Sequence, residues 1–222
     1  MPSRKIPFVV DHYYHVFNRS QHSQSIFESK ILSQYFLKTL WFYKAVSPPT
    51  KLSRFLNLEK DSYKTAYDAI DCGKQLVEVS AFCLMPNHFH LLLRQLEEGG
   101  ISKYLSQIQN SFTKIFNKKN DSYGHVFSGQ FKSVHVETEN QYLHTLRYIL
   151  LNPYSSGIIK DIQNIPTYPY SSFDERNKAV FRISSSTEFD KYFDNQQKLS
   201  EFVLNHAEYQ KSLETIKHLV LE

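Results

Sequence analysis

Apolar residues follow two different spacings along the chain, and the two spacings alternate. Strand-like runs, with alternating or continuous apolar positions, cover residues 11–19, 76–85, 88–94 and 131–137. Apolar positions three or four residues apart, which predict amphipathic helices, cover residues 31–43, 101–116 and 139–151. The resulting order β-α-β-β-α-β, followed by a helix, is typical of an α+β fold with a ferredoxin-like split βαβ core, in which the strands form one antiparallel sheet.

Proline and turn-forming residues mark where these elements end. Ser47-Pro48-Pro49 stops the first helix, because proline cannot continue the backbone hydrogen-bond ladder. Pro86-Asn87 separates the second and third strands and predicts an antiparallel hairpin. Asn152-Pro153 is expected to end the helix at residues 139–151. These breakers support the same element order as the periodicity.

Two segments fall outside this core. Residues 48–75 carry a weaker helical pattern, which we interpret as an insertion that forms a surface helix. Beyond residue 173 the chain is polar, and helical periodicity returns from about Lys198 to Val220, which predicts a helical tail. We therefore divide the chain into a core domain at residues 8–173 and a helical C-terminal extension at residues 174–222.

Composition narrows the class of protein only modestly. The 222 residues, 41% of them hydrophobic, are enough for one sizeable core. The 26 basic and 22 acidic residues give a net charge of +4, which permits a nucleic-acid partner without requiring one. The sequence has two cysteines outside any Cys-x-x-Cys spacing, no membrane-length apolar run and no apolar signal segment at its start. We therefore expect a cytoplasmic protein with no membrane partner.

The segment Met85-Pro86-Asn87-His88-Phe89-His90 places two imidazoles at the start of the third strand. Successive side chains of a strand point to opposite faces, so His88 and His90 share one face while Phe89 points to the other. Two imidazoles on a mostly apolar strand suit a pair of metal ligands. Taken alone, such a pair is more often two satisfied histidines than a metal site, so its meaning depends on what faces it.

The helix at residues 139–151 carries a polar stripe. Residues four apart share a helix face, so His144, Tyr148 and Asn152 line up while Arg147 points away. If this helix lies across the sheet face that carries the histidines, one site contains a phenol, two imidazoles and an amide oxygen. Three protein ligands with open positions suit a divalent cation that also holds a substrate oxygen.

Four segments together are similar to a known family. They are Phe82-Cys83-Leu84-Met85-Pro86-Asn87-His88-Phe89-His90, Gly129-Gln130-Phe131-Lys132-Ser133, Arg147-Tyr148-Ile149-Leu150-Leu151-Asn152-Pro153 and Tyr168-Pro169-Tyr170-Ser171-Ser172. In this order they resemble the single-tyrosine HUH transposases of the IS200-like superfamily, in particular the REP-associated tyrosine transposases, over most of residues 12–173. Relatives often carry Gly-Arg-Tyr-Lys-Ser in the second segment, so this chain has one positive charge and one phenol fewer there.

The resemblance implies an enzyme that nicks and rejoins single-stranded DNA. It makes Tyr148 the nucleophile, which leaves a 5′-phosphotyrosine on the enzyme and a free 3′-hydroxyl on the DNA. It makes His88 and His90 paired metal ligands and Asn152 a further polar group at a Mg²⁺ or Mn²⁺ ion, although imidazole suits Mn²⁺ better than Mg²⁺. His144, one helical turn before Tyr148, is either a base or phosphate contact or an exposed helix histidine.

DNA contacts and oligomeric state stay open at this point. Arg19 and Lys132, near strand ends, and Arg147 on the tyrosine helix are candidate phosphate contacts, and each is equally compatible with a solvated cation. The resemblance implies a single-stranded, hairpin-containing DNA partner and either a monomer or a homodimer. The alternative is a non-catalytic single-stranded nucleic-acid-binding module on the same fold, with Tyr14 and Phe17 stacking on bases.

Overall fold

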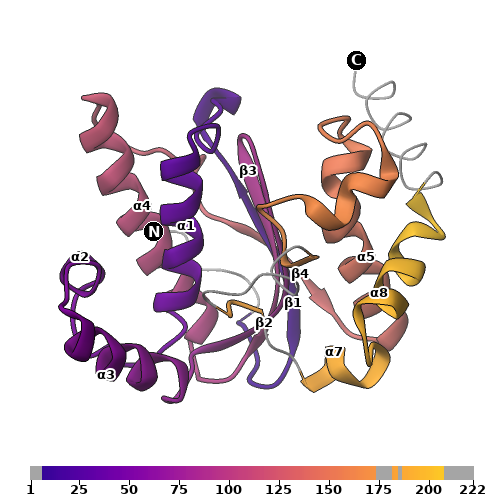
Figure 1. Ribbon diagram of the computed structural model, residues 1–222, viewed down its shortest axis with the longest axis horizontal. Coiled ribbons are helices and arrows are strands. Elements are labelled where there is room, and N and C mark those ends of the chain that lie inside the picture. Colours follow the sequence, from indigo (N-terminus) through magenta and orange to yellow (C-terminus); the bar gives the residue numbers. More distant parts are fainter. Residues whose placement is uncertain (1–6, 174–181, 185–186, 208–222) are drawn as a thin grey trace.

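A four-stranded sheet forms the centre of the computed structural model, which describes residues 7–173, 182–184 and 187–207 (Figure 1). The strands lie in the order β2-β3-β1-β4. Their bounds are Tyr13–Arg19 for β1, Val77–Met85 for β2, His88–Gln95 for β3 and Lys132–Val136 for β4. Every neighbouring pair is antiparallel, so the predicted α+β fold with a split βαβ core is confirmed.

Helices cover both faces of this sheet (Figure 1). On one side lie α1 and α4, with α2 and α3 beside them, and on the other side lie α5, α7 and α8. Their bounds are Lys30–Phe42 for α1, Leu52–Phe55 for α2, Lys60–Asp71 for α3, Gly100–Asn120 for α4, Glu139–Ser155 for α5, Thr187–Tyr192 for α7 and Gln196–Leu204 for α8, with 3₁₀ helices at Gln21–Ser23 (η1) and Ile162–Thr167 (η2). Among the described residues, no helix is both long and apolar enough to cross a membrane.

The side chains of β3 alternate between two hydrophobic cores, one on each face of the sheet. Phe89 and Leu91 are buried in the first core, which α1 and α4 cover. Leu92 belongs to the second core, under α5, and His88 and His90 occupy positions of the same parity. The two histidines therefore share one face, as predicted, and that face is the one covered by the tyrosine helix.

Residues 48–75 form part of the first core. Phe55 of α2 and Ile70 of α3 are fully buried. The ring centroids of Phe55 and Tyr67 lie 5.6 and 4.7 Å from that of Trp41, near the end of α1. Most of α3 is exposed, as the interpretation of this insertion as a surface helix expects, and a few apolar side chains of α2 and α3 cover the large ring of Trp41.

Helix α5 runs on to Ser155, one turn beyond the end that Asn152-Pro153 predicts. Proline lacks a backbone N–H, so it removes one hydrogen bond to the carbonyl of Ile149. Pro153 is buried, and Tyr154 is buried in the second core, which offsets the lost hydrogen bond. The expected helix end at residue 151 is therefore wrong.

Helix α8, which belongs to the expected C-terminal extension, packs on α5. Leu199 and Val203 of α8 are buried in the second core. The helix expected from about Lys198 is present as α8 up to Leu204, and its expected continuation to Val220 lies outside the described residues. The division of the chain at residue 173 stays a prediction.

Candidate active site

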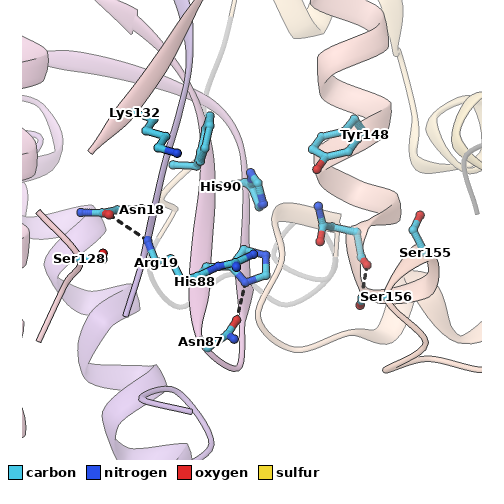
Figure 2. Close-up of a pocket in the computed structure, with 12 residues that line it drawn as sticks. Asn18, Arg19, Asn87, His88, His90, Ser128, Lys132, Tyr148, Ser155 and Ser156 are labelled. Atoms are coloured by element: carbon cyan, nitrogen blue, oxygen red, sulfur yellow. Dashed lines mark hydrogen bonds between the residues drawn. The ribbon is translucent and has the colours of Figure 1, made fainter. Parts of the chain in front are cut away.

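A cavity of about 740 Å³ opens between the sheet and α5 (Figure 2). This volume is within the range of roughly 300–1,000 Å³ that is typical of ligand pockets. The cavity is lined by Phe17, Asn18, Arg19, Asn87, His88, His90, Ser128, Lys132, Tyr148, Asn152, Ser155 and Ser156. Most of the predicted site residues are in this set, and the serines that complete it have no distinctive signal in the sequence.

Strand pairing assembles the sheet side of the cavity. Phe17 of β1 pairs with His90 of β3 on one side and with Lys132 of β4 on the other. Arg19 pairs with His88. Paired residues of an antiparallel sheet point to the same face, so two cations and one phenyl ring lie beside the two imidazoles, on the face toward α5.

Helix α5 holds Tyr148 over the histidines. A capping box between Thr138 and Gln141 begins this helix. The ring centroids of Tyr148 and His90 lie 5.6 Å apart, with the ring planes at 87°. Asn152, one turn further along, is 7% exposed and lines the same cavity. The helix therefore lies across the sheet face that carries the histidines, as the polar stripe predicts (Figure 2).

Two predicted residues of α5 lie outside the cavity. Arg147 donates a hydrogen bond from Nε to the carbonyl of Phe202, 3.1 Å away, and its guanidinium lies 3.9 Å from the centre of the Phe202 ring. Burial in this contact lowers the pKa of Arg147. Arg147 thus attaches α8 to α5, and its position does not support a DNA contact. His144 is exposed one turn before Tyr148, a position that fits an exposed helix histidine better than a base.

The expected base-stacking pair on β1 is split between the two faces of the sheet. Phe17 lines the cavity. Tyr14 is 6% exposed in the first core, where its hydroxyl accepts a hydrogen bond from the N–H of Val9 and its ring meets that of Phe8 edge-on. The expectation that Tyr14 is an exposed stacking platform is wrong, because residues 14 and 17 have opposite parity in the strand.

His15 is a site residue that the motifs miss. Its Nε2 lies 2.9 Å from Nδ1 of His90 in a hydrogen bond, and its ring centroid lies 5.8 Å from that of Tyr148. His15 is two residues before Phe17 and therefore on the same face of β1. The signal that identifies it is the same strand alternation that pairs His88 with His90.

The cavity combines positive charge with neutral imidazoles. Arg19 and Lys132 are exposed cations, and in the described part of the chain no acidic residue lines the cavity. Burial lowers the pKa of His15 to about 4. Burial also holds the pKa of His90 well below its usual value, and the nearby His15, His88 and Arg19 lower it further. Both rings are therefore neutral at pH 7, and a bound phosphate would meet positive charge without a competing carboxylate.

The imidazoles of His88 and His90 are the strongest donors that the cavity offers to a metal ion. The ring centroids of His88 and His90 lie 5.0 Å apart. Two imidazoles that share one ion have centroids roughly 5 Å apart, given metal–nitrogen bonds of about 2.1 Å. No group of three or more His, Cys, Asp or Glu side chains suited to a metal occurs among the described residues, so a third protein donor would be an amide or hydroxyl oxygen of the cavity, and Asn152 is the one that the resemblance implies. This donor set fits a divalent cation with open positions.

Comparison with known proteins assigns a family. The sequence profile of the family described as Transposase IS200 like matches residues 8–151, well over half of the chain. The chain belongs to this family. A Haemophilus influenzae protein assigned as a REP-associated tyrosine transposase is 25% identical over 138 residues, which cover 58% of this chain and 74% of the relative. The resemblance to the REP-associated tyrosine transposases is confirmed, and so is the expectation that the protein is an enzyme of the tyrosine transposase type.

A solved structure shares the fold of this IS200-like transposase. That structure is of a REP-associated tyrosine transposase bound to a REP hairpin, with a TM-score of 0.53 and 14% sequence identity. The match covers 85% of this chain and 93% of the other. The common fold therefore extends beyond the segment at residues 8–151 that the family profile matches.

Proposed function

We propose that this IS200-like transposase nicks single-stranded DNA and transfers the strand through a covalent 5′-phosphotyrosine at Tyr148, with the help of a divalent cation. The observation that carries the proposal is the position of Tyr148, whose ring centroid lies 5.6 Å from that of His90 beside a cavity that His88 and Asn152 also line. A phenol supplies a nucleophile for covalent catalysis, and the nearby cations can stabilise the charge that develops on a phosphate during the transfer.

Tyr148 is the nucleophile of the proposed reaction. Its oxygen attacks the scissile phosphorus, the bond from phosphorus to the 3′-oxygen of the preceding nucleotide breaks, and that nucleotide leaves with a free 3′-hydroxyl. The phenol loses one proton and the 3′-oxygen gains one, so neither water nor ATP is consumed. Because one ester of the phosphate replaces another, a 3′-hydroxyl can attack the phosphotyrosine and join the strand to a new end.

The cation of the proposal is Mg²⁺ or Mn²⁺, and His88, His90 and Asn152 would hold it. When bound, it supplies Lewis-acid stabilisation of the charge that develops on the phosphate oxygens. The neutral imidazole of His90 suits this role at pH 7, because its nitrogen lone pair is not blocked by a second proton. On ligand type, Mn²⁺ matches this donor set better than Mg²⁺.

Single-stranded DNA that contains a hairpin is the proposed substrate. One support is the positive charge of the cavity, where Arg19 and Lys132 would contact backbone phosphates. A second support is that the similar solved structure is bound to a REP hairpin. Phe17 pairs with Lys132 across β1 and β4 and lies in the same cavity, so it would stack on a base near the scissile phosphate.

The proposed site is complete within one chain. Tyr148 lies next to His90 of the same chain, and Arg147 attaches α8 to the helix that carries the tyrosine. These contacts support a monomer that cleaves with its own tyrosine over a homodimer that exchanges the tyrosine helix.

A covalent-adduct assay tests the proposed function. The protein is incubated with Mn²⁺ and a hairpin-containing single strand labelled at its 3′ end, so that the fragment joined to the tyrosine carries the label. Tyr148→Phe removes the attacking oxygen and should reduce the adduct to background. The control Tyr123→Phe alters a tyrosine that is 92% exposed and does not line the cavity, and should leave the adduct yield unchanged.

Two outcomes contradict the proposal. An adduct of wild-type yield in Tyr148→Phe would place the nucleophile elsewhere. Hairpin binding without any adduct in the wild-type protein would favour the non-catalytic binding module.

A further inference from the structure

Each of the two candidate metal-binding histidines has one ring nitrogen held by a neighbouring side chain. Nδ1 of His88 lies 2.6 Å from Oδ1 of Asn87, the contact drawn as a dashed line in Figure 2. Nδ1 of His90 lies 2.9 Å from Nε2 of His15. In both rings the protein therefore engages Nδ1, and Nε2 lies across the ring from that contact.

Asn87 determines the position of the proton on His88. The amide nitrogen of Asn87 donates to the carbonyl of Ser23 at 3.3 Å, which turns the amide oxygen toward His88. A carbonyl oxygen can only accept a hydrogen bond, so Nδ1 of His88 carries the proton. In the neutral form of this ring, Nε2 then carries the lone pair that a metal ion requires.

His15 can impose the same tautomer on His90. A hydrogen bond between two imidazole nitrogens contains one proton, so one ring donates and the other accepts. If His90 donates from Nδ1, its Nε2 keeps the lone pair; if His15 donates, Nε2 of His90 is protonated and cannot bind a cation. The His15 ring is packed 5.1 Å from that of His90 and 5.2 Å from that of Phe17, measured between centroids, which restrains its rotation.

We propose that His15 and Asn87 are positioning residues, which hold His90 and His88 in the tautomers protonated at Nδ1 and thereby present both Nε2 lone pairs to one cation. This inference rests on the metal-dependent reaction proposed above. Ligating histidines usually donate their second N–H to a carboxylate or a carbonyl group, which fixes the ring. Here the acceptor for His90 is an imidazole, which orients the ligand without adding a negative charge that would repel a DNA phosphate.

Side-chain NMR of the metal-free protein distinguishes the tautomers. Long-range ¹H–¹⁵N spectra of histidine rings separate protonation at Nδ1 from protonation at Nε2. We expect the Nδ1–H form for both His88 and His90 in the wild-type protein. His15→Phe keeps a flat ring of similar size but cannot accept a hydrogen bond, so it should shift His90 toward the Nε2–H form and leave His88 unchanged.

Binding of Mn²⁺ gives the second readout, measured by electron paramagnetic resonance in the Tyr148→Phe background, where no DNA chemistry occurs. His15→Phe should weaken Mn²⁺ binding by about 10-fold or more, the usual effect of removing a partner of a ligating histidine. His15→Gln, whose side-chain oxygen can accept, should restore most of the affinity. The matched control His12→Phe removes an exposed histidine that pairs with His135 away from the cavity, and should change neither readout.

The outcomes separate this inference from the proposed function. A wild-type His90 protonated at Nε2, or a folded His15→Phe variant that binds Mn²⁺ as tightly as its parent, overturns the positioning role. If His15→Phe does not fold, His15→Gln becomes the test, because its side-chain oxygen can accept the hydrogen bond. Loss of the Nδ1–H form of His90 in His15→Gln would then overturn the positioning role equally. If both rings are in the Nδ1–H form and yet neither the wild-type protein nor any variant binds Mn²⁺, the metal requirement of the proposed function fails, and the role of His15 and Asn87 is limited to fixing the tautomers.

Discussion

Mild acid should destabilise this protein through His15. The ring lies between β1 and the tyrosine helix, and burial lowers its pKa to about 4. An unfolded histidine has a pKa of about 6.5. Between these two values the unfolded state binds more protons than the folded state, so the free energy of unfolding falls as the pH falls through this window.

The size of the effect follows from the two pKa values. At pH 5 the unfolded histidine is almost fully protonated, whereas His15 in the folded state is mostly neutral. The linkage relation then gives a loss of about 2 kcal/mol between pH 7.5 and pH 5 from His15 alone. The pKa of His90 is lowered as well, so the wild-type protein should lose more than this amount.

Urea unfolding of the metal-free protein with a chelator, at pH 7.5 and at pH 5.0, measures the loss. His15→Phe should lose about 2 kcal/mol less than the wild type between the two pH values, whatever its stability at pH 7.5. His12→Phe, which removes an exposed histidine, should lose as much as the wild type. Equal losses in the wild type and in His15→Phe would refute the reasoning, because His15 would then bind protons equally in the folded and unfolded states.

Two further predictions concern the cations and the insertion. Lys132→Ala should weaken single-stranded DNA binding and reduce the slope of log affinity against log salt by about 0.7, as fluorescence anisotropy at several salt concentrations measures, and an unchanged slope would contradict a phosphate contact. Arg147→Ala should leave DNA binding unchanged and destabilise the fold by about 1–2 kcal/mol in urea unfolding. Ile70→Ala should lower the free energy of unfolding in urea by about 2–5 kcal/mol, because the Ile70 side chain is fully buried. The control Lys64→Ala, at an exposed position of α3, should change it by less than about 0.5 kcal/mol, and equal effects would show that α3 is not part of the first core.

Much of the candidate site follows from local backbone geometry. Side chains alternate along any strand, so the spacing of His88 and His90 is enough to place both on one face. The four-residue spacing of Tyr148 and Asn152 places both on one side of a helix, because residues four apart in a helix share a face. The order of strands and helices likewise follows from periodicity within each segment.

Two features that local rules do not indicate come from long-range packing. Helix α5 continues past Pro153 because Tyr154 is buried in the second core, which no local rule indicates. Arg147 packs against Phe202 although the two are 55 residues apart in the chain, so its helical position alone does not determine whether it contacts DNA or protein.

By itself, the sequence determined the elements, their order and the chemistry of the site: a phenol on a helix and two imidazoles on a strand. The tertiary structure decided the register of β1 against β3, and this register brings His15 to His90 across a separation of 75 residues. The placement of α5 over the histidines also required the tertiary structure. The physical reason is that periodicity fixes which face of each element is apolar, whereas the choice of neighbours depends on burying the apolar faces of all the elements at once.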